Sequence, residues 1–197
     1  TTSLIMADFP GIGRAHYDQW RVAFLEHVYI SRKASASSSR KSIFIGDSLV
    51  KNFCRGKSAA IFKEHFPDHL NFGIGGDKVE NVHFRVKHNG IPKSVNDVVI
   101  LVGTNNLAAH HGPSSVAKAI MRLAACIKET IDVHGTIFVS GILPRFDRFG
   151  KLVPLVNKEL EELCSKYSEH TYIDHTVALF PVNLFKDDGI HLRRYGY

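Results

Sequence analysis

The sequence holds a serine in a setting that suits nucleophilic chemistry. Ser48 lies in the string Gly46-Asp47-Ser48-Leu49, directly after a short apolar run. If a strand ends there and a helix begins, backbone N–H groups at the helix start favour negative charge developing near the hydroxyl. The same string also suits a plain helix cap, in which Asp47 or Ser48 only accepts a backbone hydrogen bond.

A histidine near the end of the sequence could take up the serine proton. His191 ends the string Asp188-Gly189-Ile190-His191, and a general-base histidine needs a carboxylate on its other ring nitrogen. The three-residue spacing lets the Asp188 and His191 side chains meet on a turn. Asp187 competes for the same role, and a surface loop with an unrelated histidine remains the alternative.

Two further strings could supply hydrogen-bond donors to an oxyanion. In Asn71–Asp77 (NFGIGGD), a backbone N–H of Gly76 or Gly75 could approach a reacting group closely. The spacing is not that of a dinucleotide-binding loop. In the string GTNN, the side-chain amide of Asn105 could donate as well. Sharp turns without a catalytic role are the alternative for both strings.

The elements that position these strings alternate along the chain. Short runs rich in Val and Ile predict strands buried on both faces of a parallel sheet, at residues 42–45, 70–72, 97–102, 136–139 and 172–173. Apolar positions at helical spacing predict helices between them. One such helix contains Val116, Ile120, Leu123, Ile127 and Ile131, with Pro113 in its first turn, and the next contains Val156, Leu160, Leu163 and Tyr167. This alternation predicts a doubly wound α/β sandwich with the four strings at the carboxyl ends of the strands.

The first 40 residues are expected to pack on this core. Residues 15–30 carry Trp20, Phe24 and Val28 at helical spacing and predict an amphipathic helix. Residues 31–42 (SRKASASSSRKS) are serine-rich and predict a flexible connection. We therefore expect one domain overall, with the helix and connection in residues 1–40 and the core in 41–197.

Composition narrows the class of protein. The 197 residues carry a formal net charge of +6, which suits surface lysines that maintain solubility, although it also favours anionic partners. The three cysteines form no disulfide pattern. No segment approaches the ~20 apolar residues of a membrane span, and no signal-peptide pattern opens the chain.

The histidines show no zinc spacing, and pairs such as His110-His111 or His65 with His69 are typical of surface loops. The charged loop residues Arg145, Arg148 and Lys151 are expected to be exposed, and contact with a phosphate-bearing substrate is the alternative role.

The joint order of these motifs resembles the SGNH (GDSL-like) hydrolase family from about Lys41 to the end. The family's four blocks match Ser48, the Gly75-Gly76 turn, Asn105 and His191. The strings NFGIGGD, VGTNN and GILPR and the tryptophan-bearing helix are similar to the catalytic α subunits of the intracellular platelet-activating-factor acetylhydrolases. The tail DDGIHL is nearer to the general family pattern.

The resemblance implies an α/β, flavodoxin-like three-layer α/β/α sandwich with a five-stranded parallel sheet. It implies a serine esterase that hydrolyses short acyl esters of the acetyl type, lipid esters among them. Ser48, Asp188 and His191 would be the catalytic triad, and the N–H groups of Ser48 and Gly76 with the Asn105 side chain would be the oxyanion hole. It further implies no cofactor, no metal and, as is frequent in the family, a homodimer. The cysteines, which show no disulfide pattern, favour a reducing compartment, and we expect a cytoplasmic location.

Two alternatives remain open from the sequence. Some SGNH-like domains have become nucleic-acid-binding modules, and the positive charge with the RRYGY tail would suit that role. Esterase domains of this type also occur in first-ORF proteins of LINE retrotransposons. Intact catalytic strings favour the esterase over the binding module.

Overall fold

The centre of the molecule is one parallel sheet. A computed structural model describes residues 14–37, 39–175, 181–193 and 196. Its five-stranded sheet has the strand order β2-β1-β4-β6-β7, and every neighbouring pair is parallel. The strands are β1 (Ser42–Gly46), β2 (His69–Gly73), β4 (Val98–Leu101), β6 (Ile137–Ser140) and β7 (His170–Ile173). All five predicted strands are confirmed.

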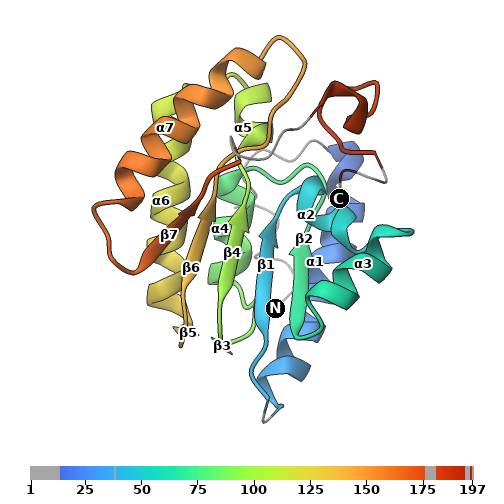
Figure 1. Cartoon of the computed structure of the whole chain (residues 1–197). Coiled ribbons are helices and arrows are strands. Elements are labelled where there is room, and N and C mark those ends of the chain that lie inside the picture. The colour runs from blue at the N-terminus through green and yellow to red at the C-terminus, as the bar shows by residue number, and fades with distance from the viewer. Residues whose placement is uncertain (1–13, 38, 176–180, 194–195, 197) are drawn as a thin grey trace.

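Helices cover both faces of the sheet, as the three-layer prediction requires (Figure 1). Side chains alternate along β1, so that Ile43 and Ile45 join the larger apolar core while Phe44 joins a second core on the opposite face. The larger core packs against α4 (Val79–Lys87), α6 (Pro113–Thr130) and α7 (Val153–Cys164). The second core packs against α2 (Ser48–Phe53) and α3 (Ser58–His65).

The shorter elements complete the connections. They are α5 (Thr104–Ala108), the 3₁₀ helices η2 (Gly150–Leu152) and η3 (Val182–Leu184), and the two-residue strands β3 (Ser94–Val95) and β5 (Asp132–Val133). The two short strands pair in parallel as a separate ladder, which the sequence patterns did not predict.

Helix α1 (Arg14–Ser35) confirms the predicted N-terminal amphipathic helix. Trp20 and Phe24 are buried and pack with Ile74, and both rings contact Phe84 of α4. The helix is therefore anchored on the core next to the loop that follows β2. The division of the chain at residue 40 stays a prediction.

The predicted flexible connection at residues 31–42 is wrong in its first part. The helix continues through Ser31, whose hydroxyl donates to the carbonyl oxygen of His27 at 2.7 Å and which is only 3% exposed. Ser35 accepts a hydrogen bond from the backbone N–H of Lys93. A serine on the buried face of a helix can satisfy its hydroxyl one turn back, so serine content alone did not locate the helix end.

The long helices follow their apolar patterns. The predicted inner face of α6 is buried, and Pro113 occupies its first turn. In α7, Val156 and Leu160 are buried as predicted, but Tyr167 lies beyond the helix and is 50% exposed. None of the helices described combines the length and apolar character that crossing a bilayer requires.

Candidate active site

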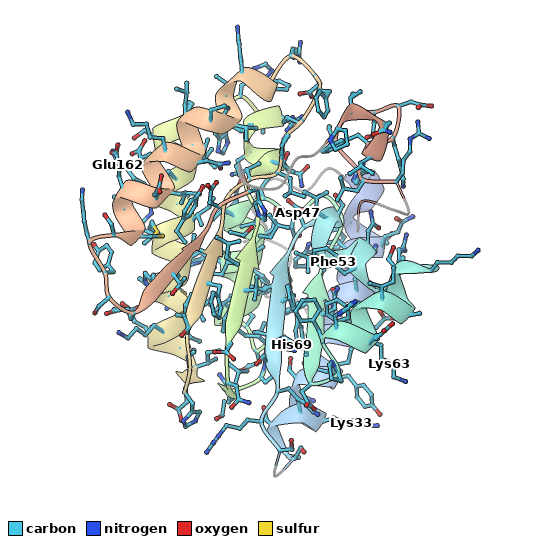
Figure 2. All side chains as sticks on the ribbon, in the orientation of Figure 1. Lys33, Asp47, Phe53, Lys63, His69 and Glu162 are labelled. Carbon is cyan, nitrogen blue, oxygen red and sulfur yellow. The ribbon has the colours of Figure 1, made fainter. Side chains whose placement is uncertain are left out.

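The nucleophile candidate begins α2 immediately after β1. Gly46 ends the strand, and a side chain there could not be accommodated because its Cβ would lie 1.9 Å from the Leu101 carbonyl oxygen. Asp47 is fully buried and caps the helix, since its Oδ1 accepts from the Leu49 N–H at 2.9 Å. Figure 2 places Asp47 at the carboxyl end of the strands. Capping therefore falls to Asp47, and the Ser48 hydroxyl makes a different contact.

That contact is with His191. The Ser48 Oγ lies 2.7 Å from Nε2 of the imidazole, and Nδ1 of the same ring lies 2.7 Å from Oδ2 of Asp188. The carboxyl-terminal segment that carries both residues lies above α2 (Figure 1). The structure thus brings together the three side chains that the sequence nominated as a triad.

Asp188 is held in place by the backbone of its own turn. Its Oδ1 accepts hydrogen bonds from the N–H groups of Ile190 and His191, both at 2.9 Å. Burial pushes the pKa of Asp188 upward, but these two bonds and the imidazole outweigh it and lower the pKa to about 2. The carboxylate is consequently ionised at neutral pH.

The neighbouring Asp187 points elsewhere. Its carboxylate pairs with Arg193 at 2.6 Å, and its side chain is 97% exposed. Of the two adjacent aspartates, Asp188 is therefore the one that contacts the histidine.

The two predicted donor loops lie next to each other. Gly76 has a φ of +81°, a conformation that glycine adopts without strain. A Cβ on Gly75 would lie 3.9 Å from the Ser48 Cβ, which places this loop beside the nucleophile. The Asn105 amide donates to the carbonyl oxygen of Asp77 at 2.9 Å, its one hydrogen bond among the described residues, and an amide carries a second N–H.

A buried serine–histidine contact at the carboxyl end of the sheet was not predicted from the sequence. Ser140 Oγ lies 2.7 Å from Nε2 of His175, at the ends of β6 and β7. Ser140 is only 3% exposed, and its hydroxyl also donates to the Gly141 carbonyl oxygen, whereas Ser48 is partly exposed at a helix start. Burial therefore distinguishes Ser140 from Ser48 as a nucleophile.

Other residues singled out in the sequence have structural roles or lie apart. Arg145, expected to be exposed, is instead 6% exposed and donates to the Thr104 carbonyl oxygen and to Asp147. Its position in the chain gave no sign of these partners. Within the described part of the chain, no group of three metal-ligating side chains occurs.

Comparisons with known proteins identify the family of this chain. Residues 44–197 match the sequence profile of the GDSL-like Lipase/Acylhydrolase family. The chain belongs to this family, and it is an ester hydrolase.

More specific similarity is to one group of relatives. The chain is 34% identical over 188 residues to platelet-activating factor acetylhydrolase IB subunit alpha1 of Homo sapiens, covering 88% of this chain and 76% of the relative. It is 36% identical over 110 residues to the alpha2 subunit of Homo sapiens, covering 54% of this chain and 45% of the relative.

Solved structures share the fold. A putative platelet activating factor protein from Streptococcus pneumonia superposes with a TM-score of 0.71 at 19% identity, covering 91% of this chain and 88% of that one. An acetyl xylan esterase from Geobacillus stearothermophilus gives a TM-score of 0.59 at 16% identity, covering 81% and 90%. The predicted fold class is confirmed.

Proposed function

We propose that this ester hydrolase uses Ser48 as its nucleophile, with His191 as general base and Asp188 as the carboxylate that orients it. The observation that carries the proposal is the continuous path from the Ser48 hydroxyl through both imidazole nitrogens to Asp188, with 2.7 Å at each end. Because the carboxylate accepts from Nδ1–H, the tautomer that leaves Nε2 free to accept the serine proton is favoured.

The reaction is acyl transfer to water. As Ser48 attacks the ester carbonyl carbon, its proton passes to His191 Nε2, and the imidazolium then protonates the leaving alcohol. Water, deprotonated by the same nitrogen, attacks the acyl-enzyme, and the Ser48 Oγ leaves with the returned proton. The Asp188 carboxylate stabilises the imidazolium in both steps.

The oxyanion of each tetrahedral intermediate is held by three donors in this proposal. They are the Ser48 and Gly76 backbone N–H groups and the Asn105 side chain. The proximity of the Gly75-Gly76 loop to Ser48 and the bond that holds Asn105 against Asp77 support this assignment. Donors that are fixed before the reaction need no reorganisation as charge develops.

We infer that the acyl group is short, of the acetyl type. The human relatives are named acetylhydrolases, and one structural neighbour is an acetyl xylan esterase. A series of p-nitrophenyl esters tests this directly: kcat/KM should be highest for the acetate and fall for the butyrate and octanoate. A preference for the octanoate would contradict it.

The triad is tested by a pair of serine variants. Ser48→Ala should abolish p-nitrophenyl acetate turnover and labelling by a fluorophosphonate probe. Ser140→Ala, which removes another hydroxyl that lies 2.7 Å from a histidine Nε2, should keep both. Circular dichroism checks that each variant is folded. Wild-type turnover by Ser48→Ala, or a probe adduct mapped to Ser140, would overturn the assignment.

The remaining expectations from the sequence stay predictions. These are homodimer formation, the location in the cell and the alternative of nucleic-acid binding.

A further inference from the structure

A buried ion pair lies beneath the proposed site. Arg85 of α4 and Asp77, which directly follows Gly76, both have fully inaccessible side chains. The guanidinium donates to Asp77 Oδ2 from Nε at 2.9 Å and from Nη2 at 2.7 Å. Burying two charges is costly unless geometry and additional hydrogen bonds compensate, so the further contacts of this pair matter.

Those contacts reach the three loops that carry the proposed nucleophile and the proposed oxyanion donors. Arg85 Nη2 also donates to the carbonyl oxygen of Gly46, two residues before Ser48, at 3.2 Å. The Asp77 backbone carbonyl holds the Asn105 amide at 2.9 Å. The nucleophile turn, the glycine loop and the asparagine are thus joined through two side chains.

The second oxygen of Asp77 is held by the N-terminal helix. The indole N–H of Trp20 donates to Asp77 Oδ1 at 2.6 Å, although the two residues are 57 positions apart. His27 lies seven residues after Trp20 on α1, and its Nδ1 is 3.4 Å from Arg85 Nη1. Burial, then Arg85 and Lys51, lowers the pKa of His27 to about 3, so this imidazole is neutral and can accept from Arg85.

We propose that Trp20 and Arg85 are positioning residues, which through Asp77 set the spacing between the Ser48 nucleophile and the oxyanion donors. Helix α1 is then part of the catalytic framework and not only a cover for the core. The proposal rests on the proposed function of Ser48, Gly76 and Asn105.

Trp20 and Arg85 can position the site because their hydrogen bonds to the buried Asp77 carboxylate form a rigid network. Asp77 accepts from three side-chain N–H groups at once, so its backbone, and with it the adjacent Gly76, has little freedom to shift. Small displacements of a donor from the transition-state oxygen cost rate without changing how the ground-state ester binds. Loss of the indole N–H should consequently lower kcat and leave KM nearly unchanged.

The principal variant is Trp20→Phe, which keeps an aromatic ring next to Phe24 and Phe84 but removes the donor to Asp77. We expect kcat for p-nitrophenyl acetate to fall about tenfold, with a parallel fall in the rate of fluorophosphonate labelling. Arg85→Lys is a second variant, since one ammonium cannot hold Asp77 and Gly46 with the fork of a guanidinium. It should lower kcat further.

The matched control is Phe24→Leu on the same helix. Phe24 stacks on Trp20 with 5.3 Å between ring centroids and is 7% exposed. Its side chain has no donor, so it cannot hydrogen-bond to Asp77 as Trp20 does. We expect Phe24→Leu to lower the urea midpoint while kcat stays within about twofold of wild type. A purely structural role for α1 would instead make kcat follow stability in all three variants.

The outcomes separate this inference from the proposed function. If Ser48→Ala is inactive and Trp20→Phe is folded with wild-type kcat, the positioning role is wrong while the triad stands. If Ser48→Ala keeps its activity, the triad itself fails. A rise in KM alone in Trp20→Phe would also overturn the positioning role.

Discussion

The Ser48 hydroxyl and the His191 imidazole lie 2.7 Å apart, although 143 positions separate them in the chain. Ser48 is fixed by β1 and α2, whereas His191 belongs to the short segment after η3. That segment is tied to the second core by Phe185 and Leu192, which are both buried and form an isolated antiparallel bridge. The chemistry therefore depends on how firmly a short segment is anchored.

Asp188→Asn tests the carboxylate. The asparagine Oδ1 can still accept from the two backbone N–H groups, so the turn should persist, but the amide would present an N–H to His191 and favour the wrong tautomer. We expect kcat to fall about a thousandfold or more with little change in KM, measured on p-nitrophenyl acetate.

Asp187→Asn is the matched control, because it changes the adjacent carboxylate that pairs with Arg193. It should retain wild-type turnover. Equal losses in the two variants would argue against a specific role for Asp188.

Asn105→Ala tests the side-chain oxyanion donor. Removing one such donor should lower kcat about 100-fold or more, because the lost hydrogen bond is strongest in the transition state. Asn96→Ala provides the control. Asn96 is exposed and precedes β4, whereas Asn105 follows β4 at the other end of the strand. Turnover at the wild-type rate in Asn105→Ala would remove Asn105 from the oxyanion hole.

Asp47→Asn tests the buried cap through the pH dependence of stability. Burial raises the pKa of Asp47 from 3.8 to about 7, and its Oδ2 has no hydrogen-bond partner among the residues that the structure describes. As pH rises from about 4 to 7, the unfolded chain loses this proton while the folded chain keeps it, so wild-type stability falls over that range.

The asparagine cannot ionise and can still cap α2 with its Oδ1. We expect Asp47→Asn to be more stable than wild type at pH 8, by at most about 4 kcal/mol, and to show little advantage at pH 4. Urea unfolding at the two pH values measures this. An equal difference at both would show that ionisation of Asp47 is not the cause.

Much of the fold could be predicted because strands in a parallel sheet are buried on both faces. Segments such as Val98–Leu101 therefore appear as continuous apolar runs, and the polar strings after them fall at one end of the sheet. The pairing of Asp188 with His191 could also be predicted from the sequence, because a three-residue spacing on a turn brings the two side chains together without distant contacts.

Other features were decided by contacts between distant segments. The choice of Asp188 over Asp187 follows from where Arg193 lies, and the helical state of Ser31 follows from its burial against the core. The sequence predicts an exposed loop charge at Arg145, but the folded chain buries its guanidinium in hydrogen bonds to Thr104 and Asp147.

The amino-acid sequence by itself determined which residues could react, because side-chain chemistry and local spacing are properties of the chain. Tertiary structure alone decided which of them meet. A hydroxyl–imidazole distance and the burial of the Asp77–Arg85 pair depend on segments that only packing brings together, and no local pattern encodes that packing.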